Sequence, residues 1–548
     1  MRKTPILLAA AVTLVTTGPV RAQEPSNDHV KQLVAQALQQ VEQGVPAAAS
    51  LLPEGPTIRL SVDEAVQRAL ERNLDIQVQR LEPQLLDLQY AGLWATYRPT
   101  ITSSLFTQNQ TNLPADQLAG GIGQSVNQIK NDTMQWNGGV LQNLRWGGGV
   151  AQVSFNNTRL ETSQVTALHN PSYTSFLQAQ YTQPLLRNFR TDQTRSSLLI
   201  TQLQQQITDL NLRSTLTVTE ASVRNAYWDL VFAIENVEVA RRSLELSTKL
   251  VQDNRARVEI GTMAPIDIVQ AQAEEATRRQ TLVNAEATRR TNELALKRLI
   301  VGGTDDDLWN ATIEPTDRPS PVPEALDLEG AVRNALANRV DLAVARRSLE
   351  QNEIAMRTLR NQTLPELNLI ANYNLQGRGG TQFVRQGIGG AVTDTIPGGY
   401  LDALRTMSNF TAPTWSLRFN LNYPIGQSQA EANFARARVQ VTQTQAQLKQ
   451  AELIIATEVT NAALTVRNSL EAVQASAVAR ELSERRLEAA QSKFEVGMAT
   501  NFEVVQAQRD LVDARTTELR NILNHRKALV DFERSQLAGT SRSVTAIR

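Results

Sequence analysis

A fifteen-residue stretch occurs twice, and this internal repeat constrains the fold more than any other feature. The first copy is residues 258–272 and the second is residues 494–508. Their glycines, Gly261 and Gly497, differ in number by 497 − 261 = 236, and the Val-Gln-Ala-Gln that follows each glycine keeps this offset. A glycine that ends one helix shortly before the next helix opens predicts a helical hairpin. Because each copy interrupts a very long stretch with helical periodicity, each should be the bend of an αα-hairpin.

The duplication extends beyond the two bends. Residues 326–332 match residues 60–66, and two single positions keep the same offset, 331 − 65 = 365 − 99 = 266. These positions hold Ala in the first pair and Pro in the second. Each half therefore reads as helix, strand, loop, strand, long helix, bend and return helix, which predicts two tandem repeats.

Two strands are predicted in each half, where the apolar period changes from 3.6 to 2. They are residues 101–107 and 177–182 in the first half, and residues 367–375 and 415–423 in the second. Aromatic residues lie near their ends, namely Tyr181, Trp415 and Tyr423. Strands of about ten residues with aromatic ends favour a lipid-facing apolar side, although soluble sheets also alternate.

Between the two strands of the first half lie a long loop and a hairpin, and the hairpin has no counterpart in the second half. Residues 109–137 are rich in Asn, Gln and Gly and predict a long loop. Residues 140–146 and 150–157 flank a Gly-Gly-Gly turn and predict a hairpin. The sequence leaves open whether this hairpin adds strands to the sheet or covers it.

The composition argues against several functional classes. Lys plus Arg and Asp plus Glu both number 55, so the formal net charge is zero and no basic face predicts a nucleic-acid partner. Cysteine is absent, and the three histidines are far apart in sequence, which excludes thiol chemistry and disfavours a histidine metal site. No hydrolase motif is present. We therefore expect no enzyme activity, no catalytic residue, no cofactor and no metal.

Residues 1–22 read as a secretory signal peptide, with a basic start, an apolar core and a small-x-small cleavage site ending at Ala22. No other segment approaches the length of about 20 apolar residues that a transmembrane helix needs. A chain that crosses a membrane without such helices must form a closed β-barrel, because lipid leaves unpaired backbone groups unsatisfied. Four predicted strands are too few for one barrel, so several chains must close it together.

The repeats, both bend motifs and the paired strand ends at Gln183-Pro184 and Tyr423-Pro424 resemble the TolC-type outer-membrane efflux proteins. The resemblance covers about residues 60–536. It implies a membrane α+β fold of two tandem repeats in a homotrimer. Four strands per chain would form a shared twelve-stranded β-barrel in outer-membrane lipid, and the helices would form a long periplasmic coiled-coil barrel. The far tip would dock to a periplasmic adaptor, and through it to an inner-membrane transporter.

The function that the resemblance implies is an outer-membrane exit duct of a tripartite efflux pump or type I secretion system. Such a duct is a passive conduit for drugs, metals or proteins, gated at its periplasmic tip, and the sequence does not identify the cargo. A structural coiled-coil envelope protein is the alternative. That alternative explains the long helices but not the strand pairs at equivalent points of two repeats.

The expected domain organisation follows from these patterns. In chain order it is a signal peptide (1–22), a periplasmic N-terminal extension (23–57), a first repeat (58–314), a Pro-rich linker (315–325), a second repeat (326–538) and a tail (539–548).

The resemblance assigns the two bends to the adaptor-docking tip. The matching residues are Gly261, Thr262, Met263, Ala264, Gly497, Met498, Ala499 and Thr500. A simpler interpretation of the two glycines is that each only ends a helix with a positive φ. Both interpretations are compatible with the sequence.

The family narrows its pore near this tip with acidic residues, and here the matching positions are Glu503 and Gln506, with Asp267 equivalent to Glu503 in the first hairpin. Glu503 fits the pattern, whereas Gln506 departs from it. A ring of carboxylates in a narrow pore attracts cations. Without the resemblance, Glu503 would read as a solvated helix residue.

The resemblance also implies that a Tyr and an Arg of the second hairpin hold the gate shut. The matching residues here are Phe494 and Ala499, which cannot form the same bonds. We therefore expect a different closing contact, with Arg255 or Arg257 as candidates.

Overall fold

The computed structural model describes five stretches of the chain: residues 56–114, 128–263, 265–318, 327–387 and 390–538. All of them belong to one compact unit, residues 46–548. The expected signal peptide, nearly all of the extension, much of the linker and all of the tail lie outside the described residues. None of the described helices combines the length and the apolar character that a membrane crossing requires.

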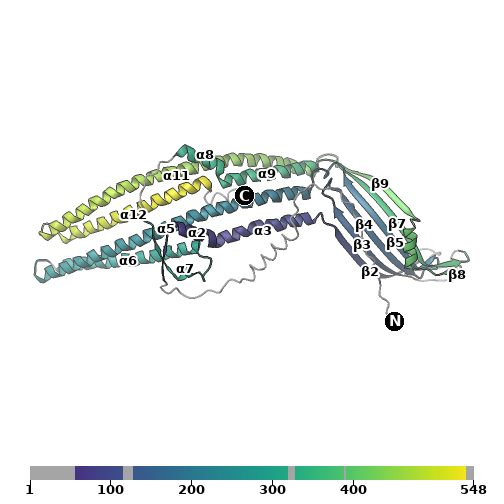
Figure 1. Ribbon diagram of the computed structural model, residues 1–548, viewed down its shortest axis with the longest axis horizontal. Coiled ribbons are helices and arrows are strands. Elements are labelled where there is room, and N and C mark those ends of the chain that lie inside the picture. The colour runs from purple at the N-terminus through teal and green to yellow at the C-terminus, as the bar shows by residue number, and fades with distance from the viewer. Residues whose placement is uncertain (1–55, 115–127, 264, 319–326, 388–389, 539–548) are drawn as a thin grey trace, which may run out of the picture. The chain divides into compact units, whose positions relative to one another are not determined.

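Two long helical hairpins make up most of the helical part (Figure 1). The first joins α5 (Gln193–Glu259) to α6 (Pro265–Ile300), and the second joins α11 (Gln429–Glu495) to α12 (Asn501–Leu537). Both α5 and α11 have 67 residues, which corresponds to about 100 Å of helix. Helix α12 also packs against α5, so the two hairpins contact one another. The predicted hairpins are confirmed.

Each repeat also begins with a pair of shorter helices. They are α2 (Val62–Arg72) and α3 (Leu74–Ala95) in the first repeat, and α8 (Leu328–Asn338) and α9 (Val340–Gln362) in the second. Helix α2 starts with a capping box, in which the Glu64 backbone N–H donates to the Ser61 hydroxyl and the Ser61 N–H donates to the Glu64 carboxylate. The first repeat ends with α7 (Asp307–Asn310) and β6 (Thr312–Pro315), which pairs in parallel with β1 (Thr57–Leu60).

Each repeat has its own hydrophobic core near these shorter helices. In the first repeat, residues of α2, α5 and α6 surround Tyr227, whose hydroxyl donates to the backbone carbonyl of Leu60. In the second repeat, α8 and α12 cover the apolar stripe of α11, including Ile455 and Val459. The buried part of this stripe is therefore covered within the chain and needs no neighbouring copy.

One antiparallel sheet contains all the remaining strands. They are β2 (Thr100–Asn112), β3 (Ile129–Asn143), β4 (Val150–Thr162), β5 (His169–Pro184), β7 (Glu366–Arg385), β8 (Val392–Ile396) and β9 (Pro413–Asn422). The order is β2-β3-β4-β5-β7, and β7 then pairs with β9 along its first half and with the short β8 near its end.

The prediction of four strands per chain is wrong, because the hairpin β3–β4 is inserted between β2 and β5. Among the described residues, the sheet contains six long strands, four from the first repeat and two from the second. The predicted loop over residues 109–137 is also wrong in part, since β2 extends to Asn112 and β3 begins at Ile129. A stretch rich in Asn, Gln and Gly has low strand propensity, but pairing with strands on both sides outweighs that preference.

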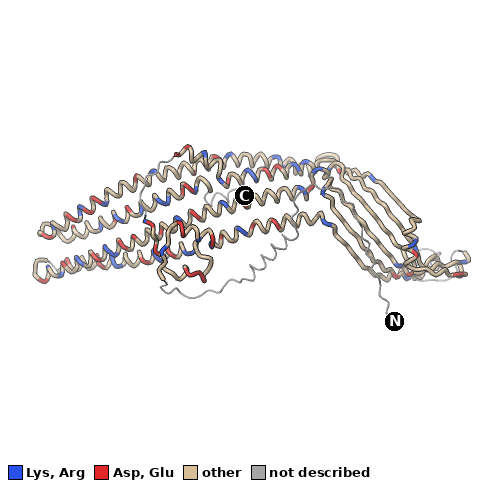
Figure 2. The backbone as a smooth tube through the Cα atoms, viewed as in Figure 1, with Lys and Arg blue, Asp and Glu red and all other residues tan. Residues whose placement is uncertain are grey.

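The strand register gives the sheet two chemically different faces. One row of paired residues crosses all six long strands on the apolar face: Ile101, Val140, Val153, Ala179, Tyr373 and Trp415. A neighbouring row on the other face is polar: Thr102, Gly139, Ser154, Gln178, Asn374 and Thr414. The inserted hairpin follows the same alternation as its neighbours, so it is an integral part of the sheet. Charged residues concentrate on the helices, while the strands are mostly uncharged (Figure 2).

A short helix, α10 (Tyr400–Ser408), packs against the far part of β7. A Cβ atom at Gly377 would lie 1.9 Å from the backbone oxygen of Ala403, so this close approach requires glycine. The Tyr400 hydroxyl donates to the Asn157 side-chain oxygen at 3.0 Å. Helix α10 thus marks where the open apolar face of β7 ends.

Candidate functional site

The turns of the two hairpins have the same backbone geometry. Gly261 and Gly497 have φ angles of 78° and 80°. The N–H of the residue after each glycine donates to a carbonyl five residues earlier, at 2.9 Å for Thr262 and 2.8 Å for Met498. This pattern is a Schellman cap, in which glycine supplies the positive φ. The interpretation of both glycines as helix-ending residues is therefore confirmed.

Large apolar side chains are exposed around both turns. Met498 is 77 % exposed, and the others are Ile260, Val496 and Phe502. Thr262 and Thr500 are exposed as well, whereas Ala264 lies outside the described residues. Sequence reasoning did not single out Ile260, Val496 or Phe502. Their position directly beside the bend glycines was the available signal.

Met263 and Ala499, two of the expected docking residues, instead pack against a hydrophobic cluster between the hairpins. The buried members of this cluster are Leu250 of α5, Phe494 of α11, and Val504 and Val505 of α12. Since these members come from both hairpins, burying them holds the two tips together.

Polar contacts join the hairpins beside this cluster. The guanidinium carbon of Arg257 lies 4.5 Å from the ring centre of Phe494, a cation–π contact, and its Nη1 is 3.4 Å from the Phe494 backbone oxygen. The side-chain amide of Asn254 donates to the Asn501 oxygen at 3.1 Å, and both residues are buried. Of the two candidate arginines, Arg257 reaches the second hairpin, while Arg255 is exposed.

A buried carboxylate further along the hairpins makes a stronger connection. Glu274 of α6, 3 % exposed, accepts hydrogen bonds from Arg278 of its own helix at 2.6 Å and from Nε of Arg509 of α12 at 3.0 Å. Burial acts to raise the pKa of Glu274, but the hydrogen bonds and charges of Arg509 and Arg278 outweigh it, so the net pKa is lowered. Sequence reasoning missed this site because glutamate on an Ala-, Gln- and Arg-rich helix reads as solvated.

In the part of the chain that the structure describes, no hydrogen bond or ion pair joins the three expected constriction residues to one another. Glu503 completes a capping box, in which its N–H donates to the Thr500 hydroxyl and its carboxylate accepts from the Thr500 N–H, both at 3.4 Å. Gln506 donates to Asp510 at 2.8 Å. Among described residues, no hydrogen bond or ion pair to the Asp267 carboxylate is observed. Glu503 therefore stabilises the start of α12 through this capping box.

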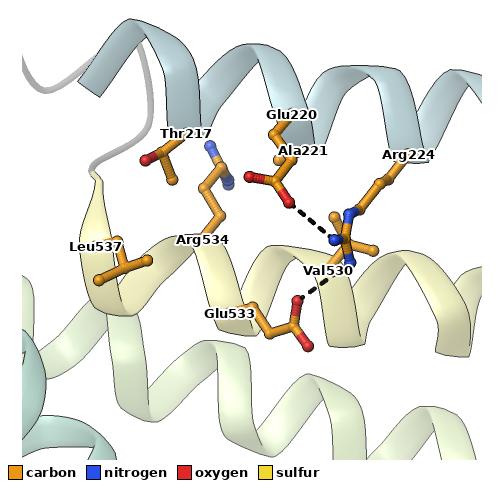
Figure 3. A pocket seen from close by; sticks show the side chains of 8 residues that line it. All are labelled: Thr217, Glu220, Ala221, Arg224, Val530, Glu533, Arg534 and Leu537. Atoms are coloured by element: carbon orange, nitrogen blue, oxygen red, sulfur yellow. Dashed lines mark hydrogen bonds and ion pairs between the residues drawn. The ribbon is translucent and has the colours of Figure 1, made fainter. Parts of the chain in front are cut away.

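Cavities lie between the helices of the two hairpins. One of about 200 Å³ is near the tips, lined by residues of α5, α11 and α12 that include Asp253, Arg257 and Glu495. Another, of about 70 Å³, lies between α5 and α12, where Arg224 bridges Glu220 at 2.8 Å and Glu533 at 3.7 Å (Figure 3). The second is too small for a drug-sized ligand. Within the described residues, no group of acidic or histidine side chains could hold a metal.

Replacing Gly497 by alanine should destabilise its turn by about 1–2 kcal/mol, because a left-handed conformation costs an L-residue that much. No heavy atom lies within 4 Å of the added Cβ, so the cost is conformational and not steric. Hydrogen exchange of the turn amides should accelerate accordingly. Gly303→Ala is the matched control, because no heavy atom lies within 4 Å of its added Cβ either and its φ is not positive. If each substitution accelerates the exchange of its own turn amides by the same factor, the prediction is wrong.

The chain matches one known protein family. The family described as "Outer membrane efflux protein" matches residues 150–302 and 331–535, one block in each repeat. No curated protein matches the chain.

Solved structures share the fold. A membrane protein from Pseudomonas aeruginosa is 15 % identical, with a TM-score of 0.63 and coverage of 90 % of this chain and 96 % of that one. CusC is 14 % identical, with a TM-score of 0.61 and coverage of 90 % and 97 %. The outer membrane protein VceC from Vibrio cholerae is 12 % identical, with a TM-score of 0.60 and coverage of 87 % and 95 %. The family match spans more than half of the sequence, and the chain belongs to the outer membrane efflux protein family.

Proposed function

We propose that the protein is the outer-membrane exit duct of a tripartite efflux pump or type I secretion system. It acts as a passive conduit for drugs, metals or proteins. It has no chemistry of its own, and partner proteins select the cargo.

The two-faced sheet is the observation that carries this proposal. Its apolar face crosses six strands and includes exposed side chains such as Ile101, Trp415 and Phe419. Its opposite face is rich in Asn, Gln, Ser and Thr, which suits a water-filled lumen. The strands lead directly into helices, since α3 ends just before β2 and α11 starts shortly after β9. A membrane sheet that continues into long helices is suited to conduct solutes across the envelope.

A second observation supports a homotrimer. Helix α11 carries apolar residues that stay exposed in the single chain: Val439, Leu453, Leu464, Val478 and Leu482. Their spacings are close to whole numbers of helical turns, which keeps these side chains on one face of the helix. Neighbouring copies would cover that face, as they would the two open edges of the sheet.

The tips are the proposed docking site for a periplasmic adaptor, through which the duct joins an inner-membrane transporter. Support comes from the exposed side chains of Ile260, Val496, Met498 and Phe502 around the turns. An exposed apolar cluster of this kind is typical of a protein-binding surface. Thr262 and Thr500 would form its polar edge, Gly261 and Gly497 would shape it, and Ala264 remains assigned to it from sequence.

The same end would hold the gate. Asp267 and Glu503 lie close to the turns, and three-fold repetition would place several carboxylates around one opening. Gln506 would leave the next layer uncharged. The contacts of Arg257, Asn254 and Glu274 with the second hairpin would keep the opening narrow until a partner separates the hairpins.

We expect Glu503→Gln to reduce cation selectivity several-fold in planar bilayers, because it removes the charge and keeps an oxygen for the helix cap. Single-channel conductance and reversal potential measure the effect. Glu503→Ala removes both charge and cap, so it should lose selectivity and also destabilise the α12 start by about 1 kcal/mol. If Glu503→Gln conducts like the unmodified protein, Glu503 is a helix cap only. A purified protein that forms no channel would refute the exit-duct proposal itself.

A further inference from the structure

Both outer edges of the sheet are open. Strand β2 pairs with β3 on one side and β9 pairs with β7 on one side, and neither has a second partner among the described strands. Natural edge strands usually carry charges, prolines or bulges that block further pairing. Strand β2 has no charged residue or proline, and β9 has only Arg418 and a proline at its first position. These edges are therefore free to pair with another strand.

The two edges have the right relative direction to pair with each other in neighbouring copies. Every neighbour in the path from β2 to β9 is antiparallel, and the path contains six long strands. With an even number of strands, β2 and β9 run in opposite directions. Strand β9 of one copy can then pair with β2 of the next as an antiparallel neighbour, and the pattern continues around a ring.

The stagger of the strands agrees with a closed barrel. The row of paired residues that starts at Thr100 ends at Ser416 on β9, through Leu141, Gln152, Gln180 and Asn372. The helix-proximal end of β9 is Asn422, so the offset in residue number is 422 − 416 = 6. At about 3.3 Å per residue over six spacings of about 4.8 Å, this offset corresponds to a tilt of about 35°. Membrane barrels have tilts of about 35–45°.

We infer that β2 of each copy pairs with β9 of the next, with Thr100 opposite Asn422, so that three copies close an 18-stranded barrel. This inference rests on the proposed outer-membrane trimer and replaces the twelve-stranded barrel expected from sequence. The inserted β3–β4 hairpin supplies the six additional strands. The occupant of each open edge is therefore a second copy of this chain.

The inserted hairpin widens the exit. With strands about 4.8 Å apart and tilted by about 35°, eighteen strands give a backbone diameter of about 34 Å, against about 22 Å for twelve. Barrels of this strand number leave an aqueous channel. The polar face, with Asn137, Gly139, Ser154 and Asn156 contributed by the hairpin, would line it. The wide end would pass solutes larger than those that a twelve-stranded barrel admits.

Cysteine pairs test the seam between copies, since the chain has no cysteine of its own. Thr102 and Asn420 face one another across the inferred seam, because 102 + 420 = 100 + 422, and both lie on the polar face. The Thr102→Cys/Asn420→Cys variant, oxidised in outer membranes, should give a covalent trimer on denaturing gels. Ile101→Cys/Asn420→Cys is the matched control, because its thiols lie on opposite faces and should not crosslink.

Two further pairs test whether the hairpin stays in the sheet. Ser104→Cys/Asn137→Cys joins β2 to β3, and Ser154→Cys/Gln178→Cys joins β4 to β5, both in the observed register. Each should form a crosslink within one chain in the assembled protein. Loss of two reactive thiols per chain, measured by mass spectrometry after alkylation, reports each bond.

Each outcome has a separate meaning. A covalent species that stays at two copies after all the introduced thiols have been oxidised would show a ring of twelve strands from two copies and would overturn the inference. Trimers that form neither hairpin crosslink, or in which Thr102→Cys/Asn420→Cys forms no crosslink, would also overturn it while leaving the exit duct intact. A protein without any membrane-embedded oligomer would refute the proposed function, and the inference with it.

Discussion

Replacing Arg339 by methionine should destabilise the protein by about 3–5 kcal/mol, the cost of breaking a buried ion pair. Arg339 joins α8 to α9 in the chain, and its side chain is fully buried. Its Nε donates to both oxygens of Asp341 at 3.1 Å, Nη1 donates to the Ser535 carbonyl at 3.2 Å, and Nη2 pairs with Glu458. Methionine fills similar space but leaves two carboxylates without the cation between them. Because α9, α11 and α12 meet here, the loss should affect the whole helical part of the second repeat.

Guanidinium unfolding of the detergent-purified protein, followed by circular dichroism, measures this effect. Arg333→Met is the matched control in α8. Arg333 lies 3.7 Å from Glu329, and their side chains are 72 % and 85 % exposed, so its loss should change stability by less than about 0.5 kcal/mol. Similar unfolding free energies for the two variants would show that the buried cluster does not stabilise the fold.

Replacing Glu274 by glutamine should loosen the contact between the two hairpins by about 2–3 kcal/mol. This cost is at or below the lower end of the range of about 3–5 kcal/mol for breaking a buried ion pair. The reason is that the Arg509 side chain is 48 % exposed, so water screens part of the interaction. Hydrogen exchange should accelerate in α6 and α12 near the contact. If the hairpins act as the gate, the same variant should also spend more time open in single-channel recordings.

This contact should also depend on pH. The folded-state pKa of Glu274 lies below its ordinary value of 4.5. Its stabilisation is therefore fully present above about pH 4.5 and is lost as the pH falls through the lowered pKa. In the unmodified protein, the protection factors of the amides at this contact, corrected for the intrinsic exchange rate at each pH, should fall on acidification, and in Glu274→Gln they should not.

Glu481→Gln provides the control for this contact. Glu481 pairs with Arg485 at 2.6 Å on the surface of α11, and the two side chains are 56 % and 72 % exposed. We expect the pH response of the hairpin contact to be unchanged in this variant. An acid response that survives in Glu274→Gln would assign it to another group.

Much of the local structure could be predicted because it depends on short-range physics. The helix ends at Gly261 and Gly497, for example, each involve only a few neighbouring residues. A positive φ or a side-chain cap leaves a recognisable residue at a fixed offset. The same is true of the repeat, which is visible as a constant spacing.

The inserted strands could not be predicted in the same way. Strand β3 contains Asn131, Asn137, Gly138 and Gly139, residues that favour loops in isolation. Its strand conformation depends on β2 and β4 supplying hydrogen-bond partners along both edges. The sequence could show the hairpin turn, but the number of strands depends on which segments pair.

The contacts between the two helical hairpins could not be predicted from the sequence either. Glu274 and Arg509 lie 235 residues apart in sequence, and neither differs locally from its solvated neighbours. The sequence alone determined the two repeats, the long helices, their bends and the alternation of the strands, because periodicity and capping are local. Only the tertiary structure decided that six long strands form the sheet and which buried charges join the hairpins. Those features depend on the packing of segments that are far apart in sequence, so no single segment determines them.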